Sequence, residues 1–104
     1  MGKRSVQGRT AEEILATLRA ELPGLRERYG VRSLGLFGSV VRREERSNSD
    51  IDILVEFDRA PTFFQFIALE DDLSRLLGAK VDLVMKSALK PRIGERILSE
   101  LLPV

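Results

Sequence analysis

The segment "DIDILVEF" at residues 50–57 constrains the fold of this chain more than any other segment does. Successive side chains of a strand point to opposite faces, so this segment has two faces of different character. One face is wholly apolar: Ile51, Ile53, Val55 and Phe57. The other face begins with two carboxylates: Asp50, Asp52, Leu54 and Glu56. The chain therefore contains a strand with one face suited to burial, and the acidic face needs a separate explanation.

The remaining helix and strand signals give the order α, β, α, β, α, β, α. Thr10 and Glu13 form a capping box in front of a helix over residues 11–21, and Pro23 with Gly24 interrupts that helix. Four further segments follow the usual helix, strand and turn patterns. They are a short helical turn over residues 25–29, a buried strand over 31–38, a short helix over 39–45 and a strand over 79–85.

Two more helices follow prolines in the second half of the chain. The first comes after Pro61, ends at Gly78 and has a broad apolar face: Phe63, Phe66, Ile67, Leu69, Leu73, Leu76 and Leu77. The second begins at Pro91 and has its own apolar stripe: Ile93, Ile97, Leu98, Leu101 and Leu102. We expect Phe63, Phe66 and Ile67 in the core. Phe64 then covers an adjoining loop or, alternatively, belongs to a dimer or partner interface.

The length of 104 residues suits one domain with one modest core. We expect a flexible basic tail at residues 1–9 and a single domain at residues 10–104. The fold class is α/β (α+β), with a small mixed β-sheet of about three strands flanked by helices. No apolar run approaches the roughly 18 residues of a membrane span, and residues 1–9 lack the apolar core of a signal peptide. We therefore expect a cytoplasmic protein with no membrane partner.

The chain contains no histidine and no cysteine, which narrows its possible chemistry. A Ser-His-Asp triad, histidine metal ligands, thiolate zinc sites and disulfides are all excluded. Acid–base chemistry is left to carboxylates, lysines, Tyr29 or a bound metal. The net charge of +1 gives no overall attraction to nucleic acid, so a nucleic-acid partner is disfavoured.

Three aspartates are candidates for a metal site. Asp50 and Asp52 project from the same strand face, about 6.5 to 7 Å apart along the backbone. Asp82 joins them if its strand pairs beside residues 50–57. Three converging carboxylates repel one another and need cations, and Mg²⁺ prefers such oxygen ligands. The alternatives are a turn cap at Asp50, a solvent-facing Asp52 and an edge-strand charge at Asp82 that discourages association between sheets.

Gly38 and Ser39 form a candidate phosphate-binding turn between a strand and a helix. Glycine allows backbone amides to approach an anion, and a helix N-terminus favours negative charge. Ser39 adds a hydroxyl donor, and Arg42, one turn later, can reach the same phosphates. A Gly-Ser pair is also a common turn, and Arg42 could equally be a solvated helix charge. The segment does not match the P-loop or dinucleotide-binding patterns.

A phosphate-binding turn beside a carboxylate metal cluster suits one reaction class. This is attack on the α-phosphorus of a nucleoside triphosphate, with two metal ions holding the attacking and leaving oxygens. Asp82 is the candidate to bind the metal that activates a hydroxyl nucleophile and to help take its proton.

The stretch "LFGSVVRREERSNSDIDILVEF" with "KVDLVM" downstream resembles the minimal nucleotidyltransferase (MNT) family of the DNA polymerase β superfamily. The resemblance covers residues 25–102, including the terminal "KPRIGERIL" helix. It implies a nucleotidyltransferase (polymerase β-like) fold for residues 10–104. Asp50 and Asp52 would ligate both Mg²⁺ ions, Asp82 would complete the catalytic site, and Gly38 with Ser39 would hold the triphosphate.

One departure concerns the residues after the Gly-Ser pair. Many relatives read G-S-x-A-R-G, whereas Val41 and Arg43 stand here in place of the alanine and the second glycine. Arg42 keeps the arginine position, so phosphate binding is retained as an expectation. The turn that follows Arg42 is expected to have a different shape.

Small members of this family resemble the antitoxin half of HEPN/MNT toxin-antitoxin pairs. The resemblance implies transfer of AMP from ATP to a tyrosine of a HEPN-type toxin. Two alternatives remain open from the sequence. One is a non-catalytic binding protein that acts by occlusion, and the other is nucleotidyl transfer to RNA or a small molecule. The nucleotide preference, the acceptor residue, the number of transfers and any homo- or hetero-oligomeric state are not fixed by the sequence.

Overall fold

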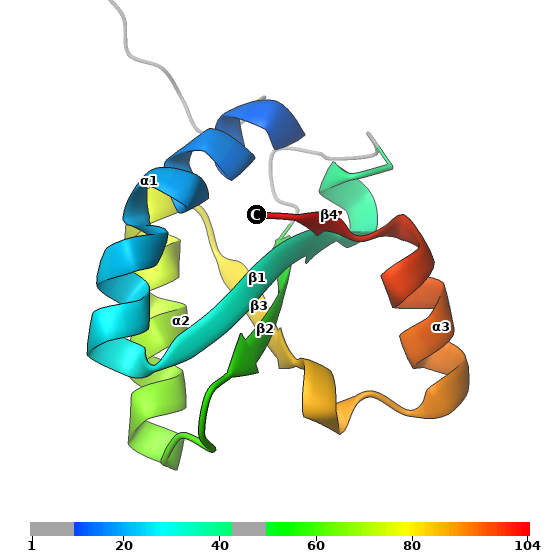
Figure 1. Cartoon of the computed structure of the whole chain (residues 1–104). Helices are drawn as coiled ribbons and strands as arrows, with labels where there is room; N and C mark the ends of the chain where they lie inside the picture. Colours follow the sequence, from blue (N-terminus) through cyan, green and yellow to red (C-terminus); the bar gives the residue numbers. More distant parts are fainter. Residues whose placement is uncertain (1–9, 43–49) are drawn as a thin grey trace, which may run out of the picture.

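The computed structural model describes residues 10–42 and 50–104, which form three helices and a four-stranded sheet (Figure 1). The elements are α1 (Ala11–Tyr29), β1 (Val31–Phe37), β2 (Ile51–Phe57), α2 (Phe63–Leu77), β3 (Val81–Met85), α3 (Pro91–Glu100) and β4 (Leu102–Pro103). Single 3₁₀ turns follow two of the strands: η1 (Gly38–Val40) and η2 (Lys86–Ala88). The tail at residues 1–9 lies outside the described residues, as does the end of the helix expected over residues 39–45. The described start of that helix is only the 3₁₀ turn η1.

The sheet is mixed, with the strand order β3-β2-β1-β4. β1 runs antiparallel to β2 and β4, whereas β2 and β3 are parallel. Three strands were expected, and the fourth corrects that number. It forms because the chain leaves α3 in an extended conformation at Leu101, after which Leu102 pairs with Leu36 and the Val104 amide donates to the Leu34 carbonyl at 2.9 Å.

α1 is one continuous helix of 19 residues, so the expected interruption at Pro23 is wrong. Proline inside a helix costs about 3 kcal/mol through a lost hydrogen bond and a steric clash. The helix continues because Leu25 lies seven residues after Leu18 on the same stripe, and both side chains are fully buried. The expected capping box of Thr10 with Glu13 is present, and Gly30 ends the helix with a φ of 70°.

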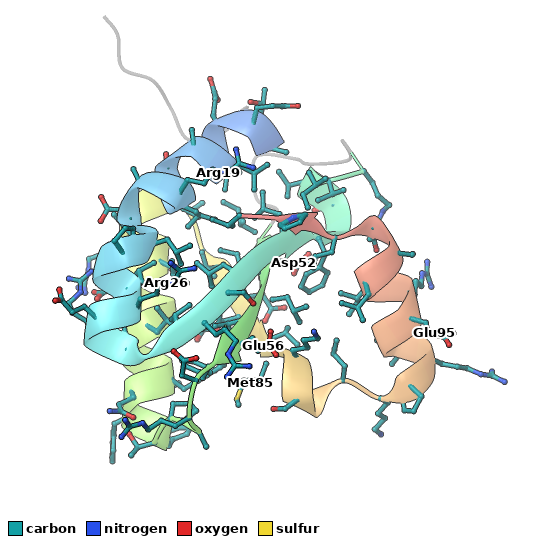
Figure 2. All side chains as sticks on the ribbon, in the orientation of Figure 1. Arg19, Arg26, Asp52, Glu56, Met85 and Glu95 are labelled. Carbon is teal, nitrogen blue, oxygen red and sulfur yellow. The ribbon has the colours of Figure 1, made fainter. Side chains whose placement is uncertain are left out.

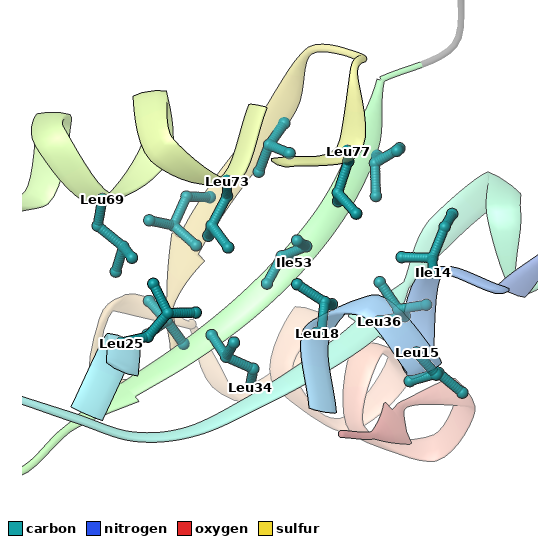
Figure 3. Close-up of a cluster of buried hydrophobic side chains, with 14 of the residues drawn as sticks. Ile14, Leu15, Leu18, Leu25, Leu34, Leu36, Ile53, Leu69, Leu73 and Leu77 are labelled. Atoms are coloured by element: carbon teal, nitrogen blue, oxygen red, sulfur yellow. The ribbon is translucent and has the colours of Figure 1, made fainter. Parts of the chain in front are cut away.

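α1 and α2 cover one face of the sheet and form the core with it (Figures 1 and 3). The apolar face expected for residues 50–57 is confirmed, because Ile51, Ile53 and Val55 are buried there. Ile53 lies between leucines from both helices in Figure 3. The acidic face of β2 consequently points away from this core.

α2 buries a narrower stripe than expected. Leu69, Leu73 and Leu77 are fully buried at four-residue spacing, but Phe63 and Ile67 are exposed, so their expected core positions are wrong. Each helical residue turns by about 100°, which places Ile67 on nearly the opposite side of the helix from Leu69. Phe64 is 80% exposed and packs edge-to-face against Phe63.

α3 lies on the other side of the sheet (Figure 1). Pro91 is its first residue, as expected, and the buried Gly94 packs against Leu89. The expected stripe is only partly right, because Ile93 and Leu98 are exposed, and Leu101 and Leu102 lie beyond the helix end. The side chain of Leu101 instead packs on β1, where Gly35 leaves room for it. Within residues 10–42 and 50–104, no helix is long and apolar enough to cross a membrane.

Candidate active site

Asp52 and Asp82 stand opposite each other on neighbouring strands. The parallel register of β2 and β3 pairs Asp52 with Asp82 and Ile51 with Val81. A parallel register keeps paired side chains on the same face of a sheet. This is the side toward α3, onto which Asp52 projects in Figure 2. The structure therefore brings together the two aspartates that the sequence separates by thirty positions.

Asp50 lies immediately before β2, two residues ahead of Asp52, and belongs to the same face by strand alternation. Its Oδ2 lies 4.0 Å from Nζ of Lys80. The amide of Ile51, between the two aspartates, donates to the Lys80 carbonyl at 2.9 Å and so fixes the start of β2 against β3. The sequence interpretation did not identify Lys80. Lys80 lies two residues before Asp82, as Asp50 lies two residues before Asp52, so the parallel register would have predicted that the two are neighbours.

Gly38 begins the turn after β1 and lies directly against Asp52. Its φ of 81° falls in the left-handed region that side chains disfavour. A Cβ atom at this position would lie 2.0 Å from Oδ2 of Asp52. Two independent features thus require glycine here, and one of them is contact with the central carboxylate. The sequence interpretation expected Gly38 to admit an anion, and the anion that it contacts within the chain is the Asp52 side chain.

Ser39 lies inside η1, half-buried, where the carbonyl of Gly38 accepts hydrogen bonds from the amides of Val41 and Arg42. Arg42 extends to the last residue of α3, and its Nη1 lies 3.0 and 3.3 Å from the two carboxylate oxygens of Glu100. Arg42 therefore ties the turn after β1 to α3. Glu100 carries no recognisable motif, and only the tertiary structure shows its proximity.

Burial and like charge act together on Asp52. Desolvation, followed by the negative charges of Asp82 and Asp50, raises the pKa of the Asp52 carboxyl to about 6. The positive charge of Arg42 lowers this pKa, and Glu100 raises it slightly. A carboxylate with a raised pKa beside two others is a position where a cation relieves repulsion.

These residues fit Mg²⁺ through their donor type and charge. Among the described residues, no group of three or more acidic side chains is assembled closely enough to hold an ion alone. Mg²⁺ is usually bound by one or two carboxylates together with waters and substrate phosphates, so a preformed cage is not required. Asp50, Asp52 and Asp82 could supply hard oxygen ligands, and the Gly38-Ser39 turn adjoins Asp52.

Comparison with known proteins identifies the family of this chain. The family model described as a nucleotidyltransferase domain matches residues 19–104. The protein adenylyltransferase MntA of Thermococcus cleftensis is 52% identical over 95 residues, covering 91% of this chain and 96% of that protein.

Solved structures give the same result for the fold. A structure assigned to a minimal nucleotidyltransferase superposes with a TM-score of 0.78 at 37% identity, covering 93% of this chain and 98% of that one. A chain in the structure of the tri-AMPylated Shewanella oneidensis HEPN toxin in complex with its MNT antitoxin was also matched. That match has a TM-score of 0.63 at 20% identity and covers 86% of this chain and 70% of the other.

The mixed four-stranded sheet with its three helices has the minimal nucleotidyltransferase fold, and Asp52 and Asp82 lie on its paired parallel strands. This chain belongs to the minimal nucleotidyltransferase family and is a nucleotidyltransferase.

Proposed function

We propose that this chain transfers AMP from ATP, with Mg²⁺, to a hydroxyl group on a partner protein of the HEPN toxin type, and acts as its antitoxin. The observation that carries the proposal is the register that sets Asp52 opposite Asp82, with Gly38 packed on Asp52. This arrangement supports the proposal because it would bring a carboxylate site and a phosphate-binding turn together at one place on the sheet.

The donor nucleotide would bind through its triphosphate at the Gly38-Ser39 turn. Backbone amides and the Ser39 hydroxyl are suitable donors to phosphate oxygens. Arg42, already held beside the site by Glu100, would add a guanidinium to the same phosphates. Asp50, Asp52 and Asp82 would hold Mg²⁺, which when bound neutralises developing charge on the phosphate and leaving-group oxygens.

In the transfer step, the acceptor oxygen forms a bond to the α-phosphorus of ATP as the bond from that phosphorus to the bridging oxygen of the β-phosphate breaks. The products are an AMP ester of the acceptor and pyrophosphate. Asp82 is the most exposed of the three aspartates, because Asp50 and Asp52 are both half-buried. It would accept the acceptor hydroxyl proton as the new bond forms.

A protein acceptor is supported by two comparisons. The Thermococcus cleftensis relative is described as a protein adenylyltransferase, and the Shewanella oneidensis complex contains an AMPylated HEPN toxin. The open side of the site gives physical support, because Asp82 on the edge strand is accessible to a macromolecular acceptor.

The test is incubation of the purified chain with a HEPN-type protein, Mg²⁺ and each nucleoside triphosphate in turn, followed by intact-mass measurement of both proteins. The proposal predicts AMP adducts on the partner with ATP only, and none with Asp52→Asn or with EDTA. A stable complex without any adduct would instead support inhibition by occlusion.

A further inference from the structure

β3 is an edge strand, and two side chains of α2 bind the backbone on both sides of its aspartate. The strand pairs with β2 alone among the described strands. The amide of Val81 donates to Oγ of Ser74 at 3.0 Å, and the amide of Leu83 donates to Oε2 of Glu70 at 3.1 Å. Both bonds are partly buried. Asp82 lies between the two residues held in this way.

The two α2 side chains act from one helix face, one turn apart. The Ser74 hydroxyl donates to the Glu70 carbonyl at 2.9 Å, which orients its oxygen so that a lone pair faces the Val81 amide. The Ser74 carbonyl in turn accepts from the amides of Gly78 and Ala79, in the turn that leads into β3. α2 is therefore hydrogen-bonded both to the turn before β3 and to the residues on either side of Asp82.

The α2 side of this path is firmly anchored. Leu73 and Leu77 on α2, and Val81 and Leu83 on β3, all belong to the buried core. On its opposite side β3 is fixed by the register with β2 and by the bond from the Ile51 amide to the Lys80 carbonyl. A strand held on one side only could fray or shift along its neighbour, and a small shift would change the separation of Asp52 and Asp82.

We propose that Glu70 and Ser74 are positioning residues for Asp82, which act by fixing the amides of Val81 and Leu83. The inference rests on the proposed function, because it takes Asp82 to be the aspartate that serves the acceptor. Neither side chain is needed to contact substrate. Their effect reaches the reaction through the backbone of β3, in the way that outer groups orient the ligands of a metal site.

The same bonds also satisfy amides of an edge strand, which is a purely structural role. The two roles make different predictions. If the bonds only stabilise the fold, replacing Glu70 would lower the amount of folded protein and leave the turnover of each folded molecule unchanged. If they position Asp82, turnover falls in fully folded protein while ATP binding at the Gly38-Ser39 turn is retained.

The experiment compares Glu70→Met, which removes the acceptor, with Glu70→Gln, which keeps an amide oxygen. Asp71→Met is the matched control, because Asp71 is an exposed neighbouring acid on α2 whose carboxylate approaches Arg75 on the same helix. Ser74→Ala and Ser74→Thr form a second pair, without and with the hydroxyl. All are assayed at a temperature where denaturant titration shows each protein to be folded.

We expect Glu70→Met and Ser74→Ala to reduce kcat for AMP transfer about 10-fold, with KM for ATP changed less than about twofold. Glu70→Gln, Ser74→Thr and Asp71→Met are expected to stay within about threefold of the parent. Amide hydrogen exchange at Val81 and Leu83 should accelerate at least about 10-fold only in the variants that lose the acceptor.

An independent arm needs no transfer reaction. Mn²⁺ added to the nucleotide-free protein should broaden the amide resonances of Asp52 and Asp82 together, and in Glu70→Met the effect at Asp82 should weaken relative to Asp52. If the parent protein transfers no AMP, the proposed function fails and this arm decides the positioning role alone. The inference would be overturned if Glu70→Met kept the parental kcat although its Leu83 amide exchanged fast. It would also be overturned if Mn²⁺ broadened the Asp82 amide in Glu70→Met as much as in the parent.

Discussion

Gly38 and Asp52 are in such close contact that a Cβ atom on Gly38 would lie 2.0 Å from the Asp52 carboxylate. Gly38→Ala must therefore displace either the turn after β1 or the carboxylate, in addition to straining a backbone with a φ of 81°. We expect AMP transfer to fall at least about 100-fold. Steady-state kinetics with the protein partner measures this loss.

Gly30 provides the matched control for that substitution. It also has a positive φ, 70°, but a Cβ atom there would meet nothing within 4 Å. Gly30→Ala should cost about 1 kcal/mol in the free energy of unfolding from backbone strain and leave kcat nearly unchanged. Equal losses of activity in the two variants would show that contact with Asp52 is not what makes Gly38 necessary.

Asp52 is expected to destabilise the metal-free protein at neutral pH. Its pKa is raised in the folded state to about 6. The protonated Asp52 carboxyl therefore contributes stability that is fully present below about pH 4 and is lost as the pH rises through 6. Because solvent screens the half-exposed Asp52, we expect its raised pKa to lower the free energy of unfolding by only about 1 to 2 kcal/mol. Asp52→Asn should be more stable than the parent by that amount at pH 7.5, and the difference should shrink toward pH 4.

Urea denaturation in EDTA across this pH range measures the effect. Mg²⁺ should narrow the difference by stabilising only the parent protein. An Asp52→Asn protein that is less stable than the parent at pH 7.5 would show that Asp52 is not held under charge repulsion in the folded state.

The strand carrying Asp50 and Asp52 could be predicted from the sequence because alternation acts over a few residues. Ile51, Ile53 and Val55 occupy one face as expected. The errors arose where tertiary packing overrides local signals. Pro23 did not stop α1, because burial of Leu25 extends the helix beyond it.

The errors on the outer face of α2 have a different cause. The sequence showed more apolar residues than one stripe can bury, and it did not show which of them face the sheet. Phe63 and Ile67 are apolar but lie off the stripe that packs against the sheet. Only the position of the helix relative to the sheet decides between such residues.

Gly35 and Leu101 form a second close contact on the α3 side of the sheet. A Cβ atom on Gly35 would lie 2.7 Å from Cδ1 of Leu101. Gly35→Ala should therefore cost about 1 to 3 kcal/mol in the free energy of unfolding, because the added methyl group overpacks the site. The same substitution should cost less when Leu101 is alanine, since the clashing atoms are then gone.

A double-mutant cycle of Gly35→Ala and Leu101→Ala, followed by urea denaturation, measures this coupling. Additive effects of the two substitutions would show that Leu101 moves away freely and does not hold α3 on the sheet.

The candidate site was only partly visible in the sequence. Asp50 and Asp52 could be placed on one face by alternation alone, whereas the inclusion of Asp82 depended on a strand pairing that the sequence could suggest but not establish. The parallel register supplies that pairing. Glu100 and Glu70 were not predictable, because a lone glutamate on a helix surface has no pattern to distinguish it from a solvated charge.

We expect Asp52 and Asp82 to serve one reaction from neighbouring strands. The most direct measurement is the rate of AMP transfer to the HEPN-type partner by the parent protein, Asp52→Asn, Asp82→Asn and the double variant, with Mg²⁺ present. Residues that act as a unit lose most activity with the first replacement, so each single variant should fall at least about 1,000-fold and the double variant little further. If Asp82→Asn transfers AMP at close to the parental rate, or if the two losses multiply in the double variant, then Asp52 and Asp82 do not act as a unit.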